Sequence, residues 1–422
     1  MTTGPVEPAE RISILDIVRG FAIFGILLIN VQFYSHPVRT IFDLRGGTLS
    51  ESDYYVILVT SFLVSEKFFS ILALLFGVGM AITFERTRAR QGRFVPLYAR
   101  RLIGLFAIGI SHALLFYAGD YIGNYALLGV LALAFCYFKP AWILPAALAV
   151  LLVPVIVSAP AILPQPAADP QVQAEQLKEQ ETMLRERTRR YNERSVRAYG
   201  HGSLSDIFRY RFRETISQYW SLLYVGWKLL AMILLGIWCW KTGIVKALKD
   251  NLGVIRKAMW ISLAVGLAGN ALSLYGAVAP PGGGPVLELL ALVGQEIGAP
   301  ALGVFYVTAI AAMYYGGIGR SFWQLFAPVG RMAMSNYVFQ SMVCTTLFYA
   351  YGLGLYGKTG YAVNVLLALA LFSLQILLSR LWFKKYAYGP LEYLLRVVMY
   401  GRVYPAKPHV AGSGEPLSEI PG

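Results

Sequence analysis

Charged residues are scarce in this chain of 422 residues: Asp, Glu, Lys and Arg make up 14% of it, whereas 57% is apolar. A soluble globular domain has about 25% charged residues. The mean hydropathy is +0.55, and the apolar residues gather in runs long enough to cross a bilayer, without the alternation of a β-barrel. The composition therefore excludes an ordinary soluble domain and predicts an all-α, polytopic integral membrane protein.

Cysteine is also rare, and the three cysteines, Cys136, Cys239 and Cys344, all lie inside apolar runs. Neither a disulfide framework nor a zinc-ligand spacing follows from them, so no metal is predicted. The first apolar run lacks a small-residue cleavage site, and we expect it to be an uncleaved span.

Acidic residues are outnumbered, with 37 Lys and Arg against 23 Asp and Glu and a net charge of +14. In a soluble protein this excess would suggest a nucleic-acid partner. Here the basic residues collect in loops on one side of the predicted spans, where anionic lipid headgroups are their neighbours. We therefore expect membrane lipids, and no nucleic acid, as partners.

The apolar runs predict about ten spans. The loop after the second span holds six arginines between residues 86 and 101, which places this loop on the cytoplasmic side and both chain ends inside (N-in/C-in). The predicted spans are 12–34, 56–84, 98–118, 121–138, 141–160, 217–240, 256–277, 287–315, 327–351 and 362–383.

Between the fifth and sixth spans the composition becomes that of a soluble segment, which alternation of the spans puts outside the cell. Its stretch 172–197 has no Gly or Pro and favours a helix, either solvated near the headgroups or acting as a cap over an outward-facing site. The expected parts are a five-helix membrane half (1–160), a soluble loop (161–216), a second five-helix half (217–396) and a flexible tail (397–422).

The first span carries polar groups at both of its ends. Asp16 and Arg19 lie near one face of the membrane, and Asn30 and His36 lie near the other. Polar groups at such depths are costly and indicate functional sites. The alternative for Asp16 and Arg19 is a simple ion pair, three residues apart, at a helix start.

The third span contains the strongest catalytic candidate, His112, and Asp120 follows near its outer end. A histidine titrates near neutrality and can act as a general base or as an acyl-accepting nucleophile. Asp120 would orient the ring if the chain folds back far enough. The alternative is a histidine bonded to a neighbouring backbone carbonyl, with no chemistry.

A charged pair, Glu66-Lys67, interrupts the long second span. Adjacent helical residues point about 100° apart, so each needs its own partner. Alternatively, the helix proper starts near Phe68 and the pair lies at its mouth. Gly77 and Gly79, later in this span, are expected to serve close helix packing.

Further polar residues lie in the C-terminal half. Glu296 is interpreted first as a structural partner for an arginine, with a proton carrier or a ligand contact as alternatives. Arg331 is placed to meet a phosphate at the cytoplasmic mouth. Asn336 and Gln340 share a helix face, which would either line a donor path or supply interhelical hydrogen bonds.

A set of residue blocks extends over most of the chain. These blocks are Arg11-x4-Asp16-x2-Arg19-Gly20-Phe21, Gly25-Ile26-Leu27 with Asn30, Leu75-Phe76-Gly77-x-Gly79, Gly109-x2-His112, Gly119-Asp120-x4-Tyr125-Ala126-Leu127, Glu296-x2-Ala299-Pro300, Gly330-Arg331-Met332-Ala333-x-Ser335-Asn336-Tyr337-x2-Gln340 and Gly389-Pro390-x-Glu392-x3-Arg396. Together they resemble the YeiB-like bacterial membrane proteins. The resemblance implies a multi-pass protein of the bacterial cytoplasmic (inner) membrane.

The N-terminal half also resembles the transmembrane acyltransferase group that includes heparan-α-glucosaminide N-acetyltransferase. Those proteins move an acyl group from cytosolic acyl-CoA to an acceptor across the membrane, with an Asn and a His after the first span as the catalytic pair. This resemblance implies Asn30 and His36 in these roles, whereas the YeiB-like block Gly109-x2-His112 implies His112. It further implies acyl-CoA or a similar thioester as donor, and a sugar, lipid or other envelope hydroxyl or amine as acceptor.

Two functions follow from these observations. The first is a membrane-bound acyltransferase whose donor enters from the arginine-rich side and meets His112, with Asn30 and Asp120 assisting. The alternative is a transporter or flippase for an anionic or lipid-like solute, using membrane-embedded charges. A homodimer is an expected assembly in either case. The candidate donor-binding residues are Asp16, Arg19, Arg100, Arg101, Glu296, Arg331, Asn336 and Gln340.

Overall fold

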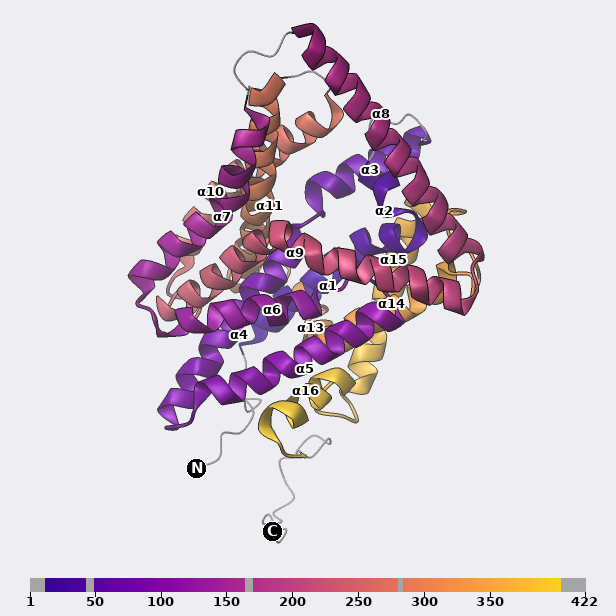
Figure 1. Ribbon diagram of the computed structural model, residues 1–422. Helices are drawn as coiled ribbons and strands as arrows, with labels where there is room; N and C mark the ends of the chain where they lie inside the picture. The colour runs from indigo at the N-terminus through magenta and orange to yellow at the C-terminus, as the bar shows by residue number, and fades with distance from the viewer. Residues whose placement is uncertain (1–11, 43–48, 164–169, 280–283, 404–422) are drawn as a thin grey trace.

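The computed structural model describes residues 12–42, 49–163, 170–279 and 284–403. These residues form helices and turns, with no strand among them, which confirms the predicted all-α fold (Figure 1). The elements are α1 (Ser13–Ser35), α2 (Val38–Phe42), α3 (Glu51–Leu63), α4 (Lys67–Ala89), α5 (Phe94–Leu115), α6 (Ile122–Ala132), η2 (Leu133–Tyr137), α7 (Pro140–Ile162), α8 (Pro170–Ser195), η3 (Val196–Gly200), α9 (Leu204–Lys241), α10 (Leu252–Val278), α11 (Gly284–Tyr315), α12 (Arg320–Gln324), α13 (Ala327–Arg331), α14 (Ala333–Phe348), α15 (Tyr361–Trp382) and α16 (Pro390–Tyr400).

Eight stretches of the described residues are long and apolar enough to cross a membrane, so the protein is a multi-pass membrane protein. The sequence predicted about ten spans. The two that fall short are 121–138, which forms α6 and the 3-10 turn η2, and 327–351, which is split at Met332 into α13 and α14. The eight stretches are Ser13–Ser35, Glu51–Ala89, Phe94–Leu115, Pro140–Ile162, Leu204–Lys241, Leu252–Val278, Gly284–Tyr315 and Tyr361–Trp382.

The second of these stretches is broken where the charged pair interrupts it. Glu66 has a left-handed backbone with a φ of 67°, and α4 begins at the next residue, Lys67. Of the two alternatives, the one in which the helix starts at this pair is therefore correct.

Glycines bring α1 and α4 into backbone contact with their neighbours. A Cβ on Gly330 of α13 would lie 1.8 Å from the Asp16 carbonyl oxygen of α1, and one on Gly77 of α4 would lie 1.9 Å from the Ile233 carbonyl oxygen of α9. Such close crossings exclude larger residues. Gly79 was expected to serve the same purpose, but a Cβ there meets nothing within 4 Å, so this part of the prediction is wrong.

A buried carboxylate fixes the C-terminal helix α16 to the start of α14. Glu392 Oε1 accepts the Met334 backbone N–H at 2.8 Å, and Oε2 accepts the Ser335 hydroxyl at 2.5 Å. The first amides of a helix have no partner within it, and Glu392 supplies one. Burial raises the pKa of Glu392. Gly389 is required because a Cβ there would lie 2.2 Å from Glu392 Oε2.

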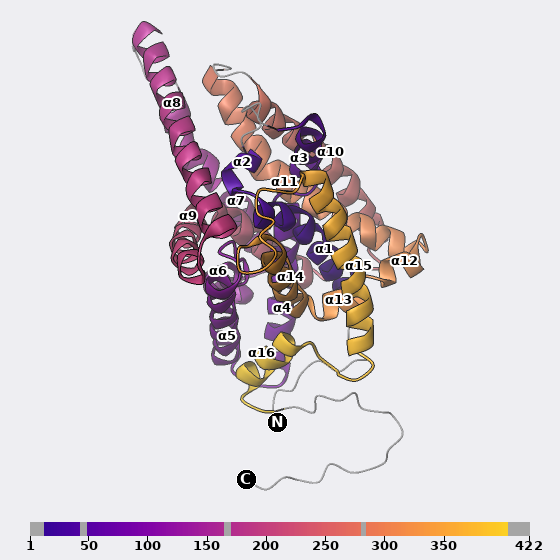
Figure 2. The ribbon, with the colours of Figure 1, turned by 90° about the vertical axis from the view of Figure 1, so that its right-hand side faces the viewer.

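The segment between the two membrane halves contains the predicted helix, α8. The segment itself is shorter than expected. α9 begins at Leu204, inside the range 161–216 that was expected to be a soluble loop. A capping box starts the helix there, with the Ser203 hydroxyl and the Asp206 carboxylate each bonding the other's backbone N–H. In both views α8 and α16 lie at opposite ends of the molecule (Figures 1 and 2).

Candidate functional site

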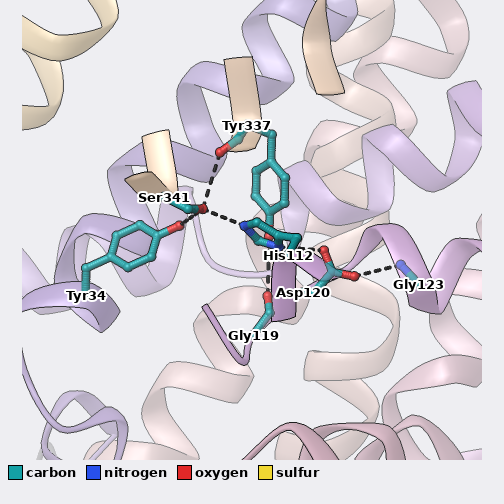
Figure 3. Close-up of polar contacts among 7 residues, drawn as sticks. All are labelled: Tyr34, His112, Gly119, Asp120, Gly123, Tyr337 and Ser341. Atoms are coloured by element: carbon teal, nitrogen blue, oxygen red, sulfur yellow. Dashed lines mark hydrogen bonds and ion pairs between the residues drawn. The ribbon is translucent and has the colours of Figure 1, made fainter. Parts of the chain in front are cut away.

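Three buried side chains, from α5, the turn after it and α14, form a hydrogen-bonded chain (Figure 3). His112 Nδ1 lies 2.9 Å from Asp120 Oδ1, and His112 Nε2 lies 2.7 Å from Ser341 Oγ. Their exposed fractions are 2%, 1% and 0% for His112, Asp120 and Ser341. Because an ionised carboxylate only accepts, the proton belongs on Nδ1, and Nε2 accepts from the Ser341 hydroxyl. We call this chain the relay.

Local sequence explains how Asp120 comes to lie beside His112. Asp120 Oδ2 accepts the Gly123 N–H at 2.7 Å, in the first turn of α6, where the helix dipole favours a negative charge. A Cβ on Gly109, one turn before His112, would lie 2.6 Å from the same oxygen. The Gly109-x2-His112 spacing thus leaves room for the carboxylate. The expected contact between His112 and Asp120 is present.

Tyrosines surround the Ser341 end of the relay. The Tyr34 hydroxyl lies 2.6 Å from Ser341 Oγ, and the Tyr337 ring lies 4.9 Å from the His112 ring, centroid to centroid. Sequence reasoning missed Ser341 and Tyr34, because neither belongs to a recognisable motif. The only usable signal was that Ser341 directly follows Gln340 in a polar stretch of α14.

A large cavity, which we call the basic cavity, lies between α1–α4 and α8–α11 and has a volume of about 1450 Å³. Asn30 and Gly119 line it close to the relay, and arginines of α8 and α9 line it farther out. Residues of α8 line this cavity, and the role of α8 as a cap over an outward-facing site stays a prediction.

A second cavity, of about 420 Å³, lies between α1, α4, α5, α14 and α16. Its size is that of a small-molecule site. Most of its lining residues are apolar or aromatic. Gly79 also lines it, and a Cβ at this position would point into open space. Five arginines also line it, and we call it the arginine-rimmed cavity: Arg19, Arg86, Arg101, Arg331 and Arg396.

Two stacked rings form a wall between the cavities. Phe69 and Tyr121 each line both cavities, and their rings lie parallel at a centroid distance of 3.7 Å and an angle of 14°. Tyr337, which packs on His112, lines the arginine-rimmed cavity, while Gly119, next to Asp120, lines the basic one. The relay therefore lies beside this wall, one residue away from each cavity.

Four of the predicted donor-binding residues line the arginine-rimmed cavity. Asp16 and Arg19 form an ion pair of 2.9 Å there. Arg101 and Arg331 line the same cavity, and the Arg331 guanidinium lies 3.9 Å from the centroid of a phenylalanine ring. Arg100 is exposed and lines neither cavity.

The two candidates at the outer end of α1 separate in the structure. Asn30 is buried and lines the basic cavity, and its Nδ2 has no hydrogen-bond partner among the described residues. His36 contacts no member of the relay: its Nδ1 lies 2.9 Å from Ser35 Oγ, and its ring stacks on Tyr361 at 4.3 Å. Asn30 thus lies one helical turn before Tyr34, which contacts Ser341, whereas His36 contacts no member of the relay.

Membrane-embedded charges form a separate cluster. Lys228 Nζ of α9 lies 2.6 Å from Glu66 Oε2 and 3.2 Å from Glu296 Oε1. Lys67 donates instead to the Ser61 carbonyl at 2.8 Å, so each member of the charged pair has its own partner, as expected. The partner of Glu296 is a lysine and not the predicted arginine. Sequence reasoning missed Lys228, which is a single charge within an apolar run.

Asn336 and Gln340 face α15. Asn336 Nδ2 donates to Ser379 Oγ at 3.1 Å, and Gln340 Nε2 donates to Gln375 Oε1 at 2.8 Å. Neither residue lines either cavity. These contacts match the interhelical alternative. The described residues include no group of three His, Cys, Asp or Glu side chains placed to hold a metal ion.

His36 should make folding stability depend on pH. Burial lowers the pKa of His36 from 6.5 to about 4. Between these values the unfolded chain binds a proton that the folded protein does not, so stability should fall by up to about 3 kcal/mol as the pH drops from 6.5 to 4. Thermal unfolding of the detergent-solubilised protein across this range measures the loss. His36→Gln should make the pH profile flatter, and an unchanged profile would contradict the assignment.

The fold and the site define a multi-pass α-helical membrane protein with a buried Ser–His–Asp chain between two cavities. Its relatives are bacterial, and the chain belongs to the YeiB-like family. Residues 239–402 match the family model described as "Protein of unknown function (DUF418)". This range includes Ser341 and Arg331 but not His112.

Relatives match over nearly the whole chain. The uncharacterized protein YxaH of Bacillus subtilis (strain 168) is 32% identical over 414 residues, covering 94% of this chain and 96% of the relative. The uncharacterized protein YeiB of Escherichia coli (strain K12) is 27% identical over 420 residues, covering 94% and 98%. No solved structure matches the chain significantly.

Proposed function

We propose that the protein is an acyltransferase of the bacterial cytoplasmic membrane, which moves an acyl group from a cytosolic thioester such as acyl-CoA to a hydroxyl or amine of the cell envelope. The observation that carries this proposal is the relay, with His112 between Asp120 and Ser341 at 2.9 and 2.7 Å. The same order of groups performs acyl transfer on unrelated folds. Its place between two cavities gives each substrate a separate approach.

The arginine-rimmed cavity supports a donor of this class. Arginine recognises phosphate through paired, charge-assisted hydrogen bonds, and several arginines line this cavity beside α16. Its apolar and aromatic interior suits an acyl chain and the arm that carries it. Arg86 lies in the last turn of α4, at the arginine-rich end that the charge rule predicts to be cytoplasmic, so a cytosolic donor would enter this cavity there.

The first step acylates Ser341. As Ser341 Oγ attacks the thioester carbonyl, His112 Nε2 takes its proton, and Asp120 stabilises the imidazolium that forms. The C–O bond forms, the C–S bond breaks, and the imidazolium returns the proton to the leaving thiolate. The products are a free thiol and a serine ester. We assign the stabilisation of the developing oxyanion to Asn30, whose Nδ2 is buried and unpartnered one helical turn before Tyr34, which contacts Ser341.

The second step releases the acyl group to the acceptor. The acceptor hydroxyl gives its proton to His112 Nε2 and attacks the ester carbonyl, after which Ser341 Oγ leaves and recovers that proton. Because the acyl group waits on the protein, the donor and the acceptor never need to occupy one space. Two cavities separated by the Phe69–Tyr121 wall fit this two-step order.

The direct test is to trap the acyl group. Purified protein is incubated with acetyl-CoA, free thiol is measured, and the digested protein is analysed by mass spectrometry. We expect slow thiol release and one acetyl group on the peptide that contains Ser341. A panel of short and long thioesters that gives neither thiol release nor a labelled peptide would overturn the acyltransferase.

The charge cluster favours a second candidate, a transporter or flippase. Lys228 and its two carboxylates lie between α4, α9 and α11, and Glu66 and Lys67 also line the basic cavity. Buried charges beside a cavity are typical of solute and proton pathways. Proteoliposomes loaded with anionic solutes or fluorescent lipids test this candidate: movement that survives His112→Ala would support it over acyl transfer.

A further inference from the structure

The basic cavity carries a large excess of positive charge. Its basic lining residues outnumber its acidic ones, which are Glu66, Asp206 and Glu214. The basic ones come from α2, the start of α4, α8, η3 and the first turns of α9. They are Arg39, Lys67, Arg187, Arg190, Arg194, Arg197, Arg209 and Arg213.

The three acidic residues are engaged by other groups. Glu66 is bound by Lys228 at 2.6 Å, Asp206 accepts the Ser203 hydroxyl at 2.6 Å, and Glu214 accepts the Tyr191 hydroxyl at 2.6 Å. Of these three described residues, only Glu66 is ion-paired, with Lys228, and the three together leave most of the eight basic residues of the lining uncompensated.

Several of the arginines lack a carboxylate partner. In the described part of the chain, Arg187, Arg194, Arg197 and Arg213 have no Asp or Glu oxygen within 4.0 Å, whereas Arg190 is paired with Glu186 at 2.7 Å. A cavity lined by like charges attracts counter-ions and concentrates anionic ligands. Guanidinium forks bind both carboxylate and phosphate in pairs of hydrogen bonds, and phosphate offers more oxygens to several arginines at once.

The remaining polar lining carries hydroxyl and amide groups. A hydroxyl can donate and accept a hydrogen bond, and an amide has a donor nitrogen and an acceptor oxygen. Both groups can therefore bind the hydroxyls of a polyol. Asn30 lies at the end nearest the relay, with its Nδ2 buried and unpaired. This polar set consists of Asn30, Ser61, Ser65, Ser217, Gln218, Ser221, Asn270, Ser273 and Gln295.

The first turns of α9 place this cavity at the depth of lipid headgroups. Leu204, Phe208 and Phe212 recur every four residues and expose 69%, 48% and 47% of their surface, so they form one apolar stripe. Arg209 and Arg213 line the cavity from another face of the same turns. A helix with an exposed apolar stripe and basic residues beside it is typical of the boundary between headgroups and acyl chains.

We infer that the basic cavity binds a polyol phosphate, with its phosphate on the arginines of α8 and α9 and a free hydroxyl directed past Asn30 toward Ser341. The role of this ligand rests on the proposed function: if the protein is an acyltransferase, the polyol phosphate is the acyl acceptor. The chemistry is shared by two sources, the headgroup of phosphatidylglycerol and free glycerol 3-phosphate.

Binding is measured without any donor, so that it is independent of acyl transfer. In one arm, protein is purified from equal amounts of phosphatidylglycerol and phosphatidylcholine, and the retained lipids are counted by native mass spectrometry. In the other arm, glycerol 3-phosphate and uncharged glycerol are titrated against the detergent-solubilised protein by calorimetry. Retention of phosphatidylglycerol alone identifies the lipid source, and binding of glycerol 3-phosphate alone identifies the free one.

The double variant Arg194→Gln/Arg197→Gln should lower the affinity for the bound ligand about tenfold, as the loss of two partly solvated charge contacts predicts. The matched control is Arg185→Gln/Arg189→Gln, which removes two exposed arginines of α8 that do not line the cavity. Equal losses in both variants, or no preference for either phosphate ligand, would overturn the inference. Selective phosphate binding in a protein that cleaves no thioester would leave it standing and remove only the acyl transfer.

Discussion

Replacement of His112 by alanine should slow thiol release from acetyl-CoA by at least about 10³-fold, because the relay then has no base to take the Ser341 proton. Ser341→Ala should cause a similar loss, since members of such a chain act as a unit and their effects do not add. The measurement is the rate of free-thiol formation at neutral pH, with the thermal unfolding midpoint recorded for each variant.

His36→Gln is the matched control, because it removes the other histidine that the sequence offered as a catalyst. Its ring contacts Ser35 and Tyr361, neither of which belongs to the relay, and its low pKa keeps it neutral at pH 7. This variant should retain thiol release. The opposite result would contradict this assignment. If His36→Gln lost thiol release while a folded His112→Ala protein stayed fully active, His36 would be the catalytic histidine and the relay would have no part in the mechanism.

Replacement of Lys228 by methionine should lower the free energy of unfolding by about 3 kcal/mol, since it leaves the buried Glu296 and the partly buried Glu66 without their cation. The ammonium group bridges Glu66 and Glu296 at 2.6 and 3.2 Å, and its side chain is only 3% exposed. Chemical or thermal unfolding in detergent measures the loss. Adding Glu66→Gln and Glu296→Gln to this variant should recover much of the stability, which separates lost charge pairing from lost packing.

Lys246→Met provides the comparison at the surface. Lys246 pairs with Glu85 at 2.7 Å, but the two side chains are 39% and 52% exposed. Water screens such a pair, and its loss should cost no more than about 1 kcal/mol. Equal effects of Lys228→Met and Lys246→Met would show that the charge cluster is not a buried structural unit.

Much of the fold followed from the sequence because hydrocarbon imposes a simple length rule on apolar runs. The helix in 172–197 was found because it lacks Gly and Pro. The contact between His112 and Asp120 was offered as one of two alternatives, on the condition that the chain folds back after the third span, and the structure shows that it does. The sequence predicted about ten spans and the described residues contain eight, because an apolar composition does not show where a helix breaks. The break at Met332 comes with the close approach of Gly330 to the α1 backbone, which is a tertiary contact.

The parts of the site that escaped prediction are those made by residues far apart in the chain. Ser341 and His112 are 229 positions apart, and Lys228 lies 162 positions from Glu66. Periodicity and spacing report neighbours along a helix, whereas only helix packing determines which distant side chains meet. The two cavities have the same origin, since each is lined by residues from both halves of the chain.

The stacked rings of Phe69 and Tyr121 also matter for the ion permeability of the membrane. Water-filled cavities that approach each other from the two ends of a membrane protein would let ions leak if they joined, because a continuous aqueous path removes the hydrocarbon barrier. With ring centroids 3.7 Å apart, the two aromatic side chains stand in contact where both cavities are lined by the same residues. Under the proposed acyl transfer, this contact would let an acyl group on Ser341 be reached from either cavity without an open aqueous path through the protein.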